Sequence, residues 1–169
     1  MAKLTVGNGL DKYIEELNKL ALNTSQILGK SIYVGAGIVA DEVRLNIENI
    51  PVSNSPRRGT QADPIDTITS AQKDGLRLGF GISGMVTRDG ITNVKLGFEG
   101  YNSQVSTTSK KAKWTHTRQA NVMIARSVEG GTSFRKKHPF VAPAVRATRK
   151  EAEAAMAEQL DKEIKAVMK

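Results

Sequence analysis

A chain of 169 residues is long enough to bury a core of its own, although 39% hydrophobic and 5% aromatic residues are low values for a compact globule. The lack of cysteine excludes disulfides and thiolate metal sites, and two distant histidines argue against a zinc site. The net charge of +8 favours polyanions or acidic proteins as partners. We expect one domain over residues 1–169, with loops or arms that become ordered against a partner.

The positive charge is concentrated in one segment. Residues 103–150 contain eleven lysines and arginines and a single acid, Glu129, whereas the rest of the chain is close to neutral. No apolar run approaches the roughly 20 residues that span a bilayer, and the N-terminus lacks a signal-peptide pattern. We therefore expect a protein that is made and kept in a cytoplasm and has no membrane contact.

Two helices are predicted at the start of the chain. Apolar residues at helical spacing predict a helix over residues 9–22, and Asn23-Thr24-Ser25 is expected to break it. A second, long helix is predicted over residues 25–49 and ends before Pro51. This second helix is rich in glycine and alanine, which allows another element to approach closely; a kink near Gly35 is the alternative.

A β-hairpin is predicted in the middle of the chain. Residues 51–68 read as a long proline-containing loop, followed by one short helical turn over residues 69–73. Hydrophobic residues then alternate from Leu76 to Ile82, and Asp89-Gly90 is a strong hairpin-turn signal. A second alternating run ends at Phe98. The hairpin is thus expected over about 76–98.

The C-terminal part is predicted to be an arm, a short helix and a long helix. Residues 102–117 have no hydrophobic period and read as a second long loop. A helix of about ten residues is then expected to end at Gly130-Gly131. Phe140 and Val141 are expected to add a strand, and Pro143 suits the first turn of a long terminal helix. The fold class is α+β: an antiparallel sheet packed against the long second helix and the C-terminal helix.

No motif points to catalysis. Residues 79–84 match GxGxxG, but a dinucleotide site needs a helix to begin there, and the chain continues into the hairpin turn instead. The sequence has no cysteine nucleophile and no HExxH or GxSxG pattern. We expect neither an enzyme nor a site for a cofactor or metal.

The basic segment is the main chemical signal. Its candidate interface or polyanion-contact residues are Lys110, Lys111, Lys113, Trp114, Arg118, Arg135, Lys136 and Lys137. Lysines and arginines of this kind can contact phosphates, meet an acidic protein surface or remain solvated. Trp114 can stack on a base or anchor the arm on a neighbouring subunit. A structural hub that docks the last helix is expected at Gly130, Gly131, Pro139, Phe140 and Pro143.

The hub also carries a family resemblance. A helix is followed by Val-Glu-Gly-Gly-Thr-Ser, then by His-Pro-Phe-Val-Ala-Pro-Ala and a long helix rich in Ala, Glu and Lys. Upstream, Ala-Asp-Glu-Val-Arg on a helix and Ile-Pro-Val precede a hairpin. This order resembles the tail-completion (head–tail joining) morphogenesis proteins of long-tailed bacteriophages. The matching hub residues are Glu129, Gly131, Thr132, Ser133, Pro139, Phe140, Pro143 and Ala144.

The resemblance implies a structural role in phage morphogenesis. Members are small α+β proteins that form rings at the neck or at the head-proximal end of the tail, without catalysis. It implies a virion protein, assembled in the host cytoplasm into a homo-oligomeric, hexameric ring that contacts neck and tail-tube proteins and passing DNA. A tail terminator ring protein and a stand-alone basic nucleic-acid-binding protein are the alternatives.

Overall fold

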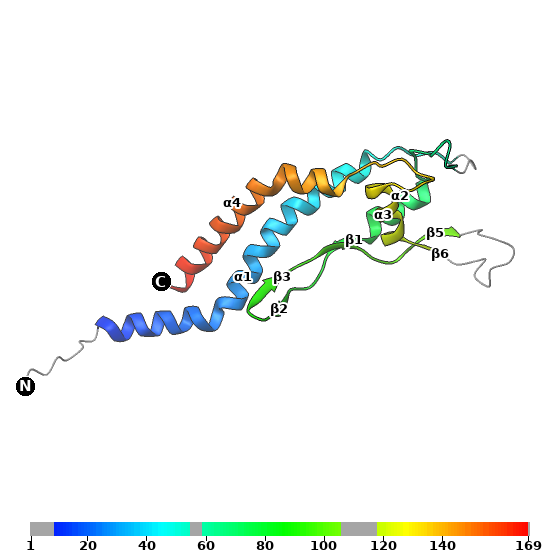
Figure 1. Ribbon diagram of the computed structural model, residues 1–169. Coiled ribbons are helices and arrows are strands. Elements are labelled where there is room, and N and C mark those ends of the chain that lie inside the picture. Colours follow the sequence, from blue (N-terminus) through cyan, green and yellow to red (C-terminus); the bar gives the residue numbers. More distant parts are fainter. Residues whose placement is uncertain (1–8, 55–58, 106–117, 169) are drawn as a thin grey trace, which may run out of the picture.

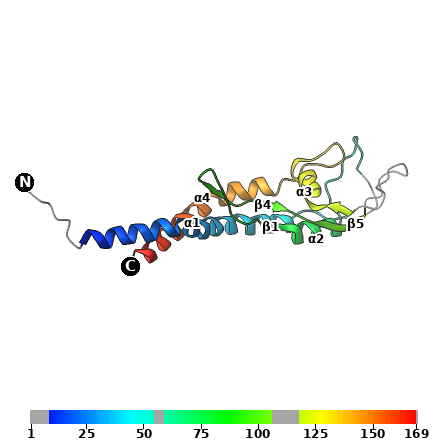
Figure 2. The ribbon, with the colours of Figure 1, turned by 90° about the horizontal axis from the view of Figure 1, so that it is seen from below.

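Two long helices run along most of the length of the described part of the chain. The computed structural model describes residues 9–54, 59–105 and 118–168. Helix α1 (Gly9–Glu48) lies antiparallel beside α4 (Val141–Val167), and a salt bridge of 2.7 Å joins Lys30 of α1 to Glu163 of α4. The helices α2 (Ser70–Gly79) and α3 (Asn121–Gly130) lie at the far end of α1 (Figure 1). The described part of the chain is elongated (Figure 2).

In the described part of the chain, the strands form three small antiparallel pairs. Strands β1 (Phe80–Ile82) and β4 (Leu96–Phe98) pair at the base of the hairpin, and β2 (Val86–Arg88) and β3 (Ile91–Asn93) pair at its tip. Strands β5 (Tyr101–Val105) and β6 (Arg118–Ala120) form the third pair. The α+β class predicted from the sequence is confirmed, with the hairpin present over residues 80–98.

The predicted break at residues 23–25 is wrong, because α1 is one helix of 40 residues. The side chain of Asn23 donates to the carbonyl oxygen of Lys19 at 2.8 Å, and that of Thr24 donates to Leu20 at 2.9 Å. Both side chains therefore bond to the preceding helical turn instead of capping a new helix. The helix therefore continues through these two polar residues.

Close approach explains the glycine in the middle of α1. A Cβ on Gly35 would lie 2.5 Å from Cγ and Sδ of Met156 on α4, so only glycine leaves room for the methionine. Met85, which precedes β2, similarly approaches Gly29. The predicted role of the small residues in close packing is confirmed at these two positions.

The predicted strand start at Leu76 is also wrong. Residues 76–79 belong to α2, which begins with a capping box in which Thr69 and Gln72 exchange side-chain-to-backbone hydrogen bonds. Two residues two positions apart share a face on a strand but point to nearly opposite sides of a helix. Accordingly, Leu76 is fully buried and Leu78 is 88% exposed.

Two further expectations need correction. Residues 102–105 of the predicted second loop (102–117) belong to β5, and the rest of that loop, residues 106–117, lies outside the described part of the chain. Phe140 and Val141 form no strand, since Phe140 is the residue before the first turn of α4 and Val141 begins that helix. The prediction that Pro143 stands in the first turn of the last helix is confirmed.

One buried cluster joins the helices to the hairpin. Its members come from α1, α2, β1, α3 and the start of α4, with Ile50 just after α1 and Ile68 just before α2. They are Ala40, Val43, Ile47, Ile50, Ile68, Leu76, Phe80, Ala125, Val128, Phe140 and Ala144. Phe98 of β4 packs between Phe80 and Phe140, with ring centroids 5.0 and 5.8 Å apart. Of the five predicted hub residues, Phe140 lies in the core, Gly131 is partly buried, and Gly130, Pro139 and Pro143 are exposed, so the expectation that Pro143 helps to dock the last helix is wrong.

Candidate functional site

The connection between α3 and α4, residues 129–144, is the most tightly organised part of the candidate site; we call it the α3–α4 joint. Glu129, in the last turn of α3, accepts three backbone N–H donors at the start of α4. Phe140 and Val141 donate to its Oε2 at 2.8 and 2.9 Å, and Ala142 donates to its Oε1 at 2.9 Å. A carboxylate from another helix thus satisfies the free amides and the positive dipole end of α4.

The environment of Glu129 favours its charged form. Partial burial acts to raise the pKa of the carboxyl, but the three backbone donors and the positive charge of Lys137 outweigh it. The pKa of Glu129 therefore lies below its ordinary value. The sequence identified Glu129 as the lone acid of the basic segment and as part of the family resemblance, but not as the residue that caps α4; its place before two glycines was a signal for a helix-end role.

The joint is fixed to the core through Phe140 and its backbone. The Phe140 side chain is 1% exposed. Asn46 of α1 donates a hydrogen bond of 3.0 Å from its side chain to the Phe140 carbonyl oxygen. Gly131, just after α3, has a φ of +74°, and a Cβ there would lie 3.1 Å from the backbone nitrogen of Lys137. A glycine at this position lets the chain reverse toward α4.

The three basic residues of the joint, Arg135, Lys136 and Lys137, differ in their exposure and contacts. Arg135 is half-buried, and its guanidinium donates to the carbonyl oxygen of Thr67 in the loop before α2. The backbone N–H of Lys136 donates to Ile65 at 2.7 Å, which attaches the same loop to the joint. Burial lowers the pKa of Arg135 from its ordinary value. Arg135 is therefore a structural clamp, whereas the side chains of Lys136 and Lys137 are exposed.

The other predicted basic residues belong to a different part of the molecule. Lys110, Lys111, Lys113 and Trp114 lie outside the described residues. Arg118 is exposed on β6, which pairs with β5 at the root of that segment. The structure brings Arg135, Lys136 and Lys137 together on the joint, and it places Arg118 on a separate element.

A cluster of amides, which the sequence analysis missed, holds the root of β5 and β6 against α2. The Thr69 hydroxyl donates to Gln104 at 2.6 Å, and the Gln72 amide donates to Gln119 at 2.7 Å. Asn121 donates to the Glu99 carbonyl oxygen at 2.8 Å. The spacing of Thr69 and Gln72 is the sequence signal that could have revealed both α2 and this cluster.

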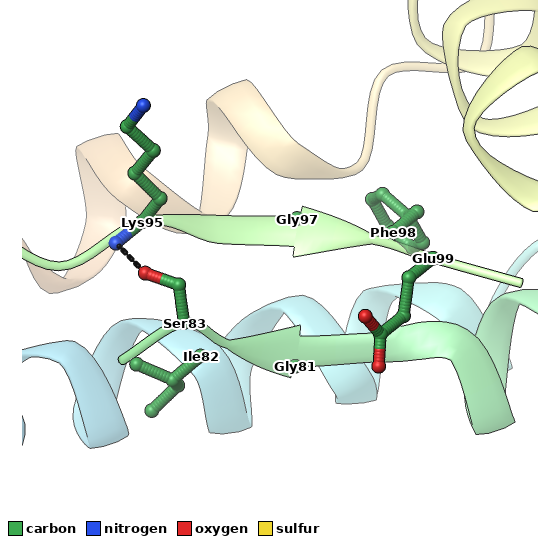
Figure 3. A pocket seen from close by; sticks show the side chains of 7 residues that line it. All are labelled: Gly81, Ile82, Ser83, Lys95, Gly97, Phe98 and Glu99. Atoms are coloured by element: carbon green, nitrogen blue, oxygen red, sulfur yellow. Dashed lines mark hydrogen bonds between the residues drawn. The ribbon is translucent and has the colours of Figure 1, made fainter. Parts of the chain in front are cut away.

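Two hollows are lined by residues that the structure describes. Figure 3 shows one of about 220 Å³ between β1 and β4, where Gly81 and Gly97 face each other and Lys95 donates its backbone N–H to the Ser83 hydroxyl at 2.8 Å. Within the described residues, the chain continues after Gly84 into β2 and not into a helix, as the sequence predicted for this glycine-rich segment. In a larger recess of about 550 Å³, Arg77 forms a salt bridge of 2.7 Å with Glu48.

Large apolar side chains are at least half exposed at several places in the described part of the chain. Seven of them lie in the first turns of α1, on α2 and at the tip of the hairpin: Tyr13, Ile14, Leu17, Leu22, Leu78, Val86 and Ile91. The others are Leu45 of α1, Tyr101 of β5, Met123 of α3 and Phe134 after α3. Apolar side chains gathered in this way are typical of surfaces that other proteins cover. These surfaces, together with the joint, form the candidate site.

Comparison of the chain with protein-family models, curated proteins and solved structures finds no match in any of the three. Within residues 9–54, 59–105 and 118–168, no three acidic or histidine side chains gather as a metal ion would require. Among the helices of this described part, none is long and apolar enough to cross a membrane. Geometry and the sequence resemblance are therefore the two sources of evidence on function.

Proposed function

We propose that this chain is a structural protein of a bacteriophage virion, a tail-completion or head–tail joining protein that forms a homo-oligomeric ring between the tail tube and the neck. The observation that carries the proposal is the arrangement of the resembling residues. Glu129 caps α4, Phe140 fills the core and Ala144 is fully buried beside it. Residues that the resemblance picked out by sequence order alone thus belong to one folded unit.

The exposed apolar surfaces support an assembly role. Both faces of the β2–β3 hairpin are largely exposed, and a two-stranded hairpin is marginally stable in water unless something packs against it. Leu78 adds a second uncovered apolar position, on α2. A subunit whose neighbours cover these surfaces would bury them only in the ring.

The charge of the chain supports a partner of opposite sign. Lys136 and Lys137 are exposed on a joint that the core and Glu129 hold in place, so their positions are defined by the fold. In a ring they would face an acidic neighbouring ring or the passing DNA. We propose no catalytic role, since the described residues offer no group of side chains arranged for one.

Native mass spectrometry combined with electron microscopy of the purified protein tests the proposal. We expect closed rings with a central channel, and a mass that is a whole multiple of 18.3 kDa, six-fold for a hexamer. The exposed lysines favour the second candidate, a stand-alone nucleic-acid-binding protein. A chain that never forms rings, alone or with tail proteins, but binds DNA with a steep salt dependence would establish this second candidate and refute the ring.

A further inference from the structure

The N-terminal turns of α1 present a surface that the described part of the chain leaves uncovered. We call residues Lys12–Gln26 the α1 overhang. None of its residues is buried, and Ile27 is the first buried residue that follows. In both views the start of α1 runs past the C-terminal end of α4 (Figures 1 and 2). Fifteen helical residues are about 22 Å long, enough for a helix-pairing seam of two heptads.

Three apolar side chains of the overhang, together with the polar Thr24, follow the spacing of such a seam. Ile14, Leu17, Ala21 and Thr24 are separated by three, four and three residues, and Leu28 continues the series. Ile14 is 53% exposed and Leu17 is 58% exposed. The neighbouring Tyr13 is 62% exposed and widens the apolar face. The pattern is that of a coiled-coil helix without its partner.

The charged residues all lie away from this seam. When Ile14 and Ala21 occupy heptad position a, and Leu17 and Thr24 occupy position d, the charged side chains fall at positions b, c and f: Lys12, Glu15, Glu16 and Lys19. They also pair within their own helix, with Lys19 and Glu15 2.8 Å apart and Lys12 and Glu16 3.9 Å apart. A partner at the seam therefore meets no charge and needs none.

These properties fit a second copy of the same segment. We propose that two copies of this chain pair through their α1 overhangs, antiparallel, with Leu17 of each copy packed against Ala21 of the other. In this register Ile14 lies opposite Thr24, so each layer places a large side chain against a small one. Lys12 lies opposite Gln26, and the two overhangs overlap over their whole length.

Antiparallel pairing also agrees with the shape of the subunit. The body of the molecule begins at Ile27, where α1 becomes buried, and extends away from the overhang (Figure 1). Two antiparallel copies extend in opposite directions, whereas two parallel copies would bring both bodies to the same side. Antiparallel helices also place opposite dipole ends together. The pairing concerns the isolated chain and does not depend on the proposed ring.

Cysteine cross-linking tests the pairing and its direction. The chain has no cysteine, so Leu17→Cys and Ala21→Cys each introduce a single thiol. After mild oxidation we expect disulfide-linked dimers mainly from the mixture of the two variants, and few from either variant alone. Equal cross-linking of Leu17→Cys with itself would indicate parallel pairing, and a mixture that stays monomeric would exclude the seam. Both results overturn the proposal.

Sedimentation of matched leucine variants gives an independent test without cross-linking. Leu22 is 85% exposed on the same helix but lies at position b, off the seam. We expect Leu17→Gln to raise the dissociation constant of the dimer by about tenfold or more, while Leu22→Gln leaves it unchanged. Circular dichroism checks that both variants keep their helices. Equal effects of the two substitutions, or a wild-type chain that is monomeric at all concentrations, would refute the inference, whereas absence of rings would not.

Discussion

Met156 of α4 packs directly against Gly35 of α1 where the two long helices meet, and this contact is possible because Gly35 has no side chain. We predict that Gly35→Ala destabilises the fold by about 1–3 kcal/mol, because the new methyl group forces the methionine and the nearby Ala152 carbonyl to move. Chemical denaturation measures the change. The companion change Met156→Ala should recover part of the loss if the overlap is its cause.

Gly37 provides the control for this prediction. It lies two residues further along α1, and a Cβ there would meet nothing within 4 Å. Gly37→Ala should therefore stabilise the protein by up to about 1 kcal/mol through helix propensity alone. If both alanine variants changed the stability in the same direction, the helix contact at Gly35 would be assigned incorrectly.

Phe140 offers a test of the core at the α3–α4 joint. Its ring is 1% exposed and makes an edge contact with Phe98. We predict that Phe140→Ala costs about 3–5 kcal/mol of unfolding free energy, since the cavity beneath α4 cannot close completely. Phe134, 58% exposed in the same connection, is the control, and Phe134→Ala should cost less than about 0.5 kcal/mol. A small loss at Phe140 would mean that α4 does not depend on this contact.

The sequence predicted the hairpin because its turn is local. Asp89 and Gly90 both have positive φ, 53° and 75°, as the tight hairpin turn requires, and this dipeptide is visible without any tertiary information. Leu76 and Leu78 misled the prediction, since their alternation with polar residues is the period of a strand. The capping box at Thr69 and Gln72 was the stronger local signal.

The site was harder to predict than the fold. Phe140 was correctly expected in the core but wrongly assigned to a strand. It stands at the start of α4, where its backbone N–H donates to Glu129, eleven residues earlier, and the sequence pattern did not reveal this contact. Arg135 was expected to be displayed with its neighbours. Its acceptor is a backbone carbonyl 68 residues away, on Thr67, and no sequence pattern marks a backbone acceptor. Contacts of this kind follow from the tertiary fold alone.

Glu129 should make the stability of the protein sensitive to acid. A carboxyl whose pKa is lower in the folded than in the unfolded chain contributes stability above its unfolded pKa, and the contribution disappears as the pH falls through the folded pKa. We predict that Glu129→Gln costs about 1–2 kcal/mol at pH 7 through the weaker cap. Between pH 7 and pH 3 the wild type should lose more stability than this variant.

Urea denaturation at several pH values measures this difference. Glu151, exposed on α4, provides the control, and Glu151→Gln should be about as stable as the wild type at pH 7. If Glu129→Gln were as stable as the wild type at pH 7, the three backbone hydrogen bonds would not hold α4 to α3. In that case the α3–α4 joint would have to be stabilised by its other contacts, among them the buried Phe140 ring and the hydrogen bond from Asn46.

Arg135 and Lys136 are adjacent cations with different predicted roles. Arg135→Met removes the donor to the Thr67 carbonyl while keeping much of the side-chain volume, and we expect a loss of about 1–3 kcal/mol in unfolding free energy. Lys136→Met removes the same charge from an exposed position and should change stability by less than about 0.5 kcal/mol. If the charge of Lys136 serves assembly, this second variant should instead weaken ring formation or binding to tail proteins at low salt. Equal losses of stability in the two variants would show that net charge, and not the clamp to Thr67, determines the effect.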